Sequence, residues 1–332
     1  MQKSFSRRSF VGALAVFGGA LPLRPSLALQ TAPARPKRIG FLLGDGYPEL
    51  AAAFRSELSR LGYKEGGDIV IEARFSRPNT TDLETMAAEL AQMDLALVVA
   101  GALPFALEVR KANPSMPMVI ATCPGMVSNG FAQTLERPGG IYTGIDELPP
   151  GVTARRLSLL KTAAPAVTRV ALLSTTPGQG GHEAQFVDAR TAGSAIGVEV
   201  QPYRAASLAE LKGALEHIAA DSMNGMLNFQ GGLSLSNRQL IVDFAAEKRI
   251  PAIYQATLFA EAGGLMAWAP DLLEQYRVAA RLVAKVLKGS RPGDLPVRHP
   301  DKYYLTVNSK AARKIGLTLP RELLAQAARV LE

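Results

Sequence analysis

The chain has 332 residues, of which 48% are hydrophobic and 20% are charged, and its formal net charge is +8. This composition is typical of a folded protein that is long enough for two domains of ordinary size. The single cysteine, Cys123, excludes an intrachain disulfide, a Cys-x-x-Cys redox pair and a cysteine-based zinc site. The sequence has no Lys/Arg run interleaved with aromatic residues, which argues against a nucleic-acid-binding surface.

The amino terminus has the pattern of an export signal. Paired arginines in SRRSFVG (residues 6–12) precede an apolar run at residues 11–23. This run is interrupted by Gly and Pro and is shorter than the roughly 20 residues that span a bilayer as a helix. We therefore expect a twin-arginine signal peptide, cleaved after Ala28, followed by a linker at residues 29–36. Because residues 1–28 hold four basic residues and no acidic one, the mature chain has 33 basic and 29 acidic residues.

Short apolar runs alternate with amphipathic patterns along the rest of the chain. Before the stretch RPGGIYTGIDELPPG (residues 137–151) we expect four strands, at residues 38–43, 68–75, 95–101 and 118–122. After it we expect strands at residues 169–174, 198–203, 225–229 and 250–254. Helices are expected between the strands, including one at residues 186–196. This alternation is typical of parallel sheets covered by helices on both faces.

The two series of elements resemble copies of one plan. They predict an α/β fold with two doubly wound parallel-sheet lobes. The stretch 137–151 would be the first of three crossings, because a long helix at 272–287 and a late strand at 303–307 indicate two more. We assign residues 37–144 with about 270–300 to lobe 1, and residues 145–269 with about 301–332 to lobe 2. Hinge residues would be Gly140, Gly144 and Ala269.

Six motifs resemble those of a known family. They are LERPGGIYTG (135–144), ELKGALEHIAA (210–220), RIPAIY (249–254), FAEAGGLMAWAPD (259–271), VLKGSRPGDLPV (286–297) and RKIGLTLP (313–320). In this order they resemble the solute-binding proteins of ABC importers, and more narrowly the branch with tryptophan- and tyrosine-type binding proteins. The resemblance covers the chain from about residue 37 to its end. It implies a type I periplasmic-binding-protein fold, in which two lobes close on a solute.

The chain departs from the family in one loop. After the fourth strand the family commonly shows an Asp-Pro-Val segment, whereas here Gly125 and Met126 stand where the Asp and Pro would be. A solute with an amine requires a buried carboxylate. This loop does not supply one.

Ligands of open α/β sheets bind beyond the carboxyl ends of the strands. The candidate ligand-binding residues lie in the loops there; they are Asp45, Tyr47, Ala102, Thr122, Cys123, Thr143, Thr175, Thr176, Gln230, Tyr254 and Trp268. Asp45 either pairs with a cationic group of the solute, with Tyr47 stacked on it, or caps the next helix.

Other loops offer groups of different chemistry. Backbone N–H groups at residues 101–105 can receive a carboxylate, while Phe105 either contacts the solute or packs in the core. The hydroxyls of Thr175 and Thr176 suit a carboxylate or hydroxyl, and the loop has no GK[ST] ending of a phosphate-binding loop. Tyr254 and Trp268 form either an aromatic wall or, for Trp268, hinge packing.

We therefore expect a periplasmic receptor that closes on a small organic solute, amino-acid-like or an aromatic or carboxylate compound. Its partners would be the permease of an ABC importer and the twin-arginine export machinery. No cofactor, metal or catalytic activity is expected, because Cys123 has no histidine at a suitable spacing and no zinc or calcium motif is present. The alternative is an exported two-lobed enzyme acting on a small carboxylate-type substrate.

Overall fold

The computed structural model describes residues 35–76, 82–176, 178, 180–229 and 231–332. Residues 36–332 form one compact unit. The predicted signal peptide at residues 1–28, most of the predicted linker, and the candidate ligand-binding residue Gln230 lie outside the described residues.

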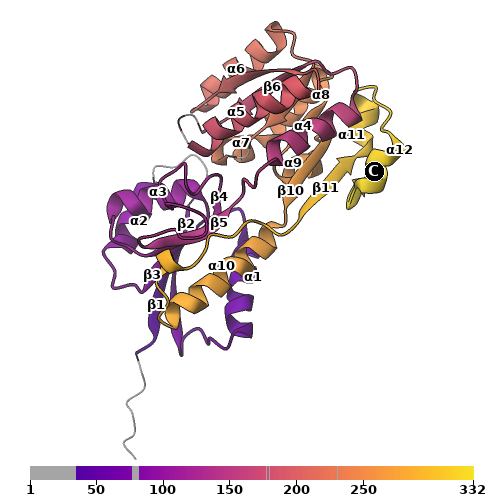
Figure 1. Ribbon diagram of the computed structural model, residues 1–332. Helices are drawn as coiled ribbons and strands as arrows, with labels where there is room; N and C mark the ends of the chain where they lie inside the picture. Colours follow the sequence, from indigo (N-terminus) through magenta and orange to yellow (C-terminus); the bar gives the residue numbers. More distant parts are fainter. Residues whose placement is uncertain (1–34, 77–81, 177, 179, 230) are drawn as a thin grey trace, which may run out of the picture. The chain divides into compact units, whose positions relative to one another are not determined.

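A five-stranded parallel sheet of order β2-β1-β3-β4-β5, with its helices, forms lobe 1 (Figure 1). Its elements are β1 (Lys37–Gly44), α1 (Pro48–Arg60), β2 (Ile69–Ser76), α2 (Asp82–Ala91), β3 (Leu97–Ala100), α3 (Leu103–Ala112), β4 (Met118–Cys123) and β5 (Tyr142–Asp146). Every residue of β3 and β4 is buried, because helices cover both faces of the sheet.

A seven-stranded sheet of order β12-β11-β10-β9-β8-β6-β7 forms lobe 2, and all its pairs are parallel except β10 with β11. Its first elements are α4 (Val152–Ala163), β6 (Arg169–Ser174), α5 (Gly180–Ala195), β7 (Glu199–Arg204), α6 (Leu208–Ala220), β8 (Gly225–Asn228), α7 (Gly232–Ser236), α8 (Arg238–Glu247), β9 (Ala252–Tyr254), α9 (Thr257–Glu261) and β10 (Met266–Pro270). Its later elements are β11 (Tyr303–Asn308), α11 (Ser309–Lys314), α12 (Arg321–Gln326) and β12 (Arg329–Leu331). Between β10 and β11, α10 (Leu272–Leu287) and the 3-10 turn η1 (Pro292–Asp294) pack on lobe 1.

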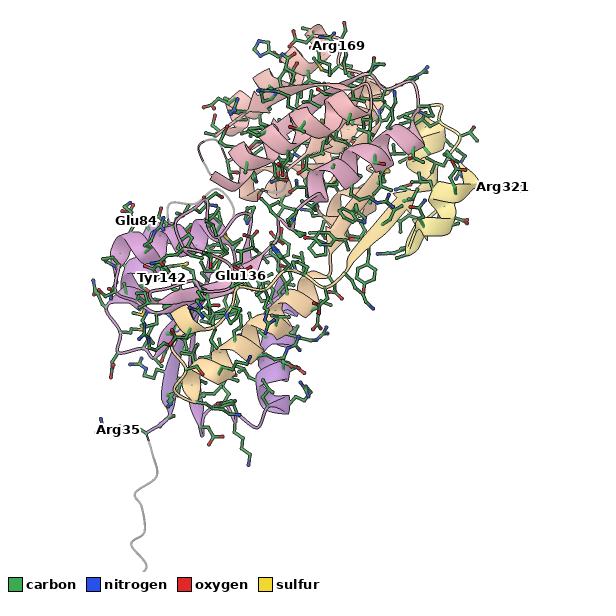
Figure 2. All side chains as sticks on the ribbon, in the orientation of Figure 1. Arg35, Glu84, Glu136, Tyr142, Arg169 and Arg321 are labelled. Atoms are coloured by element: carbon green, nitrogen blue, oxygen red, sulfur yellow. The ribbon has the colours of Figure 1, made fainter. Side chains whose placement is uncertain are left out.

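Each sheet has an apolar core on both faces. In β1, Phe41 faces the core under α1 and α10, while Leu42 faces the core under α2 and α3. In β6, Leu172 and Leu173 likewise face opposite cores of lobe 2. Alternating strand residues therefore anchor helices on both sides. Charged side chains such as Glu84, Arg169 and Arg321 point outward (Figure 2).

Two local expectations were wrong. Five strands, not four, precede the first crossing, because residues 142–146 of the Gly- and Pro-rich stretch pair with β4 as β5. Helix α5 begins at Gly180, six residues before the expected start at 186, because the Gly-rich sequence there is already helical.

The chain passes between the two sheets three times: after β5, after β10, and between η1 and β11. Gly144 is a residue of β5 and pairs with Ile120 of β4. Gly140 precedes β5 and its backbone contacts Gly293. Both glycines lie within lobe 1, close to the first crossing in sequence, and their role as hinge residues stays a prediction. Ala269 lies at the end of β10, and its hinge role stays a prediction, as do the residue bounds of the lobes.

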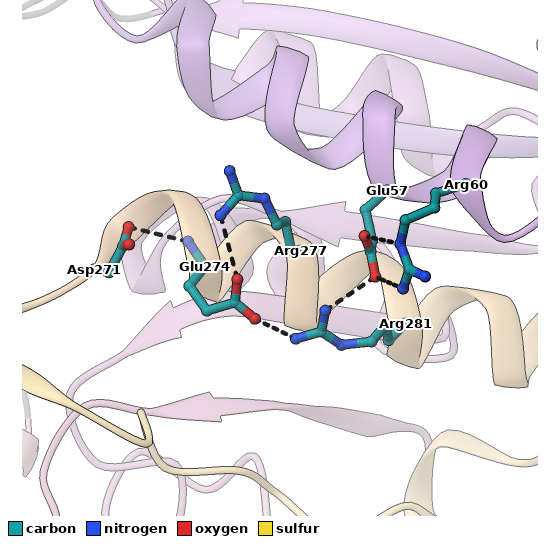
Figure 3. Close-up of polar contacts among 6 residues, drawn as sticks. All are labelled: Glu57, Arg60, Asp271, Glu274, Arg277 and Arg281. Atoms are coloured by element: carbon teal, nitrogen blue, oxygen red, sulfur yellow. Dashed lines mark hydrogen bonds and ion pairs between the residues drawn. The ribbon is translucent and has the colours of Figure 1, made fainter.

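Helix α10 follows a strand of lobe 2 but packs beside α1 of lobe 1 (Figure 1). Glu57 of α1 is only 5% exposed and accepts hydrogen bonds from Arg60 and from Arg281 of α10 (Figure 3). Arg281 also contacts Glu274, whose backbone N–H is capped by Asp271. These contacts fix α10 to lobe 1 directly after the second crossing.

The Glu57 carboxylate is stabilised by its partners. The pKa of Glu57 is lowered to about 2, mainly because Arg60 donates hydrogen bonds to its carboxylate. Burial acts in the opposite direction, and the hydrogen bond from Arg281 lowers the pKa further. A carboxyl whose pKa is lower in the folded state stabilises the fold above its unfolded pKa, and this contribution is lost as the pH falls toward the folded value.

We predict that Glu57→Gln lowers the free energy of unfolding by about 1–3 kcal/mol at pH 7. The loss should shrink to about half or less at pH 3, where the wild-type carboxyl is close to its own titration. Urea unfolding of the wild type and the variant at pH 7 and pH 3 measures the two losses. Arg277→Gln is the control: its pair with Glu274 is exposed, so it should cost less than about 0.5 kcal/mol. Equal costs for both variants would contradict the role given to Glu57.

Candidate functional site

A cavity of about 560 Å³ lies at the carboxyl ends of the strands and takes its walls from both lobes. Lobe 1 contributes the loop after β1 and the start of α3, and lobe 2 contributes residues 231–236 and Gln255. Glu147 of the first crossing, Arg156 of α4 and Pro270 at the end of β10 also line the cavity. This volume is in the range of small-molecule sites in proteins.

One wall is aromatic and apolar. Atoms of the Tyr47 and Phe105 rings lie within 4.0 Å of the position that a Cβ on Gly44 would take, and both residues line the cavity. At the inner end, the Tyr276 hydroxyl donates a 2.8 Å hydrogen bond to the Gly101 carbonyl. Such a wall suits a flat or apolar group of a ligand.

Glu147 supplies a carboxylate at the crossing end of the cavity. It follows β5 directly, and its Oε1 accepts a 3.1 Å hydrogen bond from Nε2 of Gln275 on α10. Burial raises the pKa of Glu147 to about 7, against the opposing effects of Gln275 and the Arg156 charge. The Glu147 carboxyl is therefore partly protonated at neutral pH when the cavity has no cation in it.

Arg156 supplies the opposite charge. It lies on the buried face of α4, is 2% exposed, and lines the cavity. Its Nε donates to the Trp268 carbonyl at 3.1 Å, and its guanidinium lies 5.7 Å from the centre of the Trp268 ring. Its Nη1 is buried without a hydrogen-bond partner. Burial lowers the pKa of Arg156 to about 10, which leaves it charged at neutral pH.

The three crossings meet around these two residues. The Tyr303 hydroxyl of the third crossing donates to the Glu147 carbonyl at 2.9 Å. The Tyr303 ring stacks on Trp268, beside the second crossing, with a centroid distance of 4.6 Å. A ligand group that binds Glu147 or Arg156 therefore contacts the junction of all three segments.

The mouth of the cavity has further charges. Asp45 and Glu49 of lobe 1 and Arg238 of lobe 2 line it and are exposed. Burial raises the pKa of Tyr47, and the positive charge of Arg238 opposes this shift. Salt screens the charges of these exposed residues more than it screens those of Glu147 and Arg156.

The structure brings five of the predicted ligand-binding residues to the cavity: Asp45, Tyr47, Ala102, Thr122 and Thr176. Asp45 makes no side-chain cap to α1, whose cap residue is Tyr47. Phe105, for which packing was the alternative, lines the cavity and also contacts the core. Contact of these residues with a solute stays a prediction.

Five others lie away from the cavity lining, because interior packing or bonding holds them. Cys123 is fully buried, which raises its pKa well above its usual value, and Thr143 donates to the Leu295 carbonyl. Thr175 accepts from the Ser234 N–H, Tyr254 stacks on Phe259, and Trp268 stacks on Tyr303. Gln230 is outside the described residues.

Sequence reasoning missed Glu147 and Arg156. Glu147 would have been found if residues 142–146 had been recognised as a strand, since ligand residues follow strands. Arg156 shares the helix face of Thr153, Leu157 and Leu160, all buried. A charged residue on such a face is rarely buried without a partner.

Within the part of the chain that the structure describes, no three His, Cys, Asp or Glu side chains gather as metal ligands. Among the same residues, no helix is long and apolar enough to cross a membrane.

We predict that Glu147→Gln stabilises the protein without solute by about 1–3 kcal/mol at pH 8. The folded-state pKa of Glu147 is raised, so ionisation costs stability as the pH rises through about 7, and glutamine avoids this cost. The gain should be smaller at pH 5, where the carboxyl is protonated. Thermal unfolding at both pH values tests this; a variant less stable than wild type at pH 8 would contradict the buried placement of the carboxylate.

Comparison with known proteins identifies the family. The family model described as ABC transporter substrate binding protein matches residues 39–331. The Tyrosine-binding protein of Clostridioides difficile (strain R20291) is 21% identical over 291 residues, which cover 87% of this chain and 83% of that protein.

Solved structures agree with this family. The ABC domain in complex with L-Trp from Streptococcus pneumonia has a TM-score of 0.81 at 22% identity and covers 89% of this chain and 100% of its own. An ABC transporter solute binding protein from Agrobacterium vitis with bound allitol has a TM-score of 0.59 at 15% identity and covers 84% and 97%. The type I periplasmic-binding-protein fold is thus confirmed, and the alternative of an exported enzyme is not retained. The chain belongs to the family of ABC transporter substrate-binding proteins.

Proposed function

We propose that this protein is the periplasmic receptor of an ABC importer, and that its two lobes close on an amino-acid-like solute, which it delivers to the permease. The observation that carries the proposal is the cavity at the crossings, which is lined by the aromatic rings of Tyr47 and Phe105 and by the half-buried carboxylate of Glu147 and the buried guanidinium of Arg156. An aromatic or apolar side chain would lie against Tyr47 and Phe105.

The nature of the solute is supported by two relatives. One is a tyrosine-binding protein and the other was solved with L-Trp. Both ligands combine an aromatic side chain with an ammonium and a carboxylate group. The cavity has a chemical counterpart for each of these three parts.

Closure is supported by a backbone contact between the lobes. A Cβ on Gly181, in the first turn of α5, would come 1.7 Å from the Pro124 carbonyl oxygen of the loop after β4. Only a residue without a side chain permits this approach. In a hinge mechanism, a solute that contacts both lobes favours the closed state by its greater affinity for that state.

Export to the periplasm is supported by the paired arginines and the apolar run of residues 6–23. The twin-arginine machinery would therefore be a partner before signal cleavage near Ala28. A fusion of residues 1–36 to a reporter, with Arg7→Lys and Arg8→Lys as the control, tests this route: export that persists in the lysine variant would contradict it.

We predict that one or more of the common L-amino acids stabilises the mature protein by about 2.7 kcal/mol when its concentration is 100 times the Kd. The fluorescence of Trp268, the single tryptophan of the chain, should change on binding because its ring lies beside the crossings. Trp268→Phe should lose the optical signal and keep binding heat in calorimetry. Turnover of the solute, or no binding by any amino acid, sugar or organic acid, would contradict a receptor.

We predict that Gly181→Ala weakens solute binding about tenfold or more, because the added methyl group prevents the contact with Pro124 and holds the lobes apart. Gly213→Ala in α6 is the matched control, since nothing lies within 4 Å of its added methyl group. Calorimetry gives the affinities, and solution scattering gives the compaction on binding. Unchanged affinity and compaction in Gly181→Ala would refute closure through this contact.

A further inference from the structure

We propose that Arg156 and Glu147 form the site for the charged head group of the solute, in which Arg156 binds a carboxylate and Glu147 binds the ammonium group of the same molecule. This inference rests on the proposed function, and it assigns the class of solute to zwitterions. No other charged groups among the described residues line the inner end of the cavity, since Asp45, Glu49 and Arg238 stand exposed at the mouth.

The argument for Arg156 begins with its unused donor. A buried polar group without a hydrogen bond costs free energy, and the cost is larger for a charged group. Nη1 of Arg156 is such a group in a residue that is 2% exposed. Its Nε is already held by the Trp268 carbonyl, which fixes the plane of the guanidinium. A carboxylate of the solute would supply the missing acceptor.

The argument for Glu147 is that its carboxyl oxygens have few hydrogen-bond donors around them. Its carboxyl has one hydrogen bond, from Gln275, and lies where burial disfavours its charge. Asp146, the adjacent carboxylate, accepts instead from the backbone N–H groups of Gly125, Met126 and Leu148, so it is committed to the fold. Glu147 is therefore the cavity carboxylate that remains for an ammonium group.

The two residues act on different parts of one ligand. Their charges interact, but no ion pair within 4.0 Å joins them in the described part of the chain. The cavity thus keeps one positive and one negative group apart. A carboxylate alone would leave Glu147 unpaired, and an amine alone would leave Arg156 unpaired. A solute that carries an ammonium and a carboxylate group on the same carbon offers a partner to both residues.

The location at the crossings gives the head group a second effect. Glu147 belongs to the first crossing, Gln275 follows the second, and Tyr303 of the third donates to the Glu147 carbonyl. Arg156 donates to the carbonyl of Trp268 in β10, the strand that leads into the second crossing. Binding at this pair therefore acts on all three segments about which closure occurs.

The first test compares three matched probes by calorimetry at pH 8: L-tryptophan, indole-3-propionate, which lacks the amine, and tryptamine, which lacks the carboxylate. If another of the twenty common amino acids binds most tightly, the probes are that amino acid, its analogue without the amine and its analogue without the carboxylate. We expect both analogues to bind about 10–100-fold more weakly than the zwitterion. An analogue that binds as tightly as the amino acid overturns the inference.

The second test changes the residues. Glu147→Gln should weaken amino-acid binding about 10–100-fold and change the affinity for the deaminated acid by less than about threefold. Arg156→Lys should weaken the amino acid and the deaminated acid alike and leave the amine unaffected, and thermal unfolding verifies that it is folded. Glu216→Gln, which removes an exposed carboxylate of α6 that does not line the cavity, is the matched control and should change affinity by less than about threefold. Equal losses in Glu147→Gln and Glu216→Gln would refute the assignment.

The pH dependence gives a third readout. Because only ionised Glu147 can bind an ammonium group, wild-type affinity should fall about 30-fold from pH 8 to pH 5.5, and Glu147→Gln should abolish this dependence. The titratable and charged groups near Glu147 are Asp146, Arg156, Tyr276, Tyr303 and Cys123, with Gln275 as its hydrogen-bond donor and His299 bonded to the Asp146 carbonyl. A pH dependence that persists in Glu147→Gln contradicts the role of this carboxyl. Binding of a non-zwitterionic solute alone would overturn the inference and leave the receptor function standing, whereas no solute binding overturns both.

Discussion

The burial of two opposite charges at the meeting point of the three crossings is the constraint on which this structure depends. Arg156 is buried and Glu147 is half-buried at the cavity, and neither has a full set of partners. Elsewhere such groups are paired: Glu57 has two arginines, and Asp146 has three backbone donors. A fold keeps incompletely satisfied charges where a ligand completes them, at a cost to the stability of the empty protein.

The architecture explains how these charges reach one place. Parallel strands bring the loops of each lobe to the same edge, so β5 ends at Glu147 and β10 ends at the start of α10. Helix α10 is fixed to α1 by Glu57 and Arg281, and it carries Gln275 to Glu147 and Tyr276 to the inner end of the cavity. The rigid attachment of α10 to lobe 1 leaves the short crossing segments to absorb any motion of the lobes.

Sequence patterns were sufficient to predict the fold because the spacing of apolar residues shows which faces of an element are buried. The apolar runs of β3, β4 and β6 could be covered only by helices on both faces, and the motifs fixed the family. The site was harder to predict. The rule that ligands bind at strand ends correctly predicted that Tyr47 and Thr176 line the cavity. The same rule also selected Tyr254 and Thr143, whose side chains are held in the interior. Glu147 was hidden in a segment that resembled a linker, and Asp45 was expected instead to supply the carboxylate that position 125 lacks. Which side chains point into a cavity depends on packing between distant segments, and local patterns do not report it.

The most direct measurement of this account is the pKa of the Glu147 carboxyl itself, followed by NMR of protein labelled at glutamate side chains and assigned by the signal lost in Glu147→Gln. The account predicts a pKa of about 7 without solute and a carboxyl that stays ionised across that range once an amino acid is bound, because an ammonium group then neutralises it. A Glu147 signal that titrates at the same pH with and without a bound amino acid would contradict it.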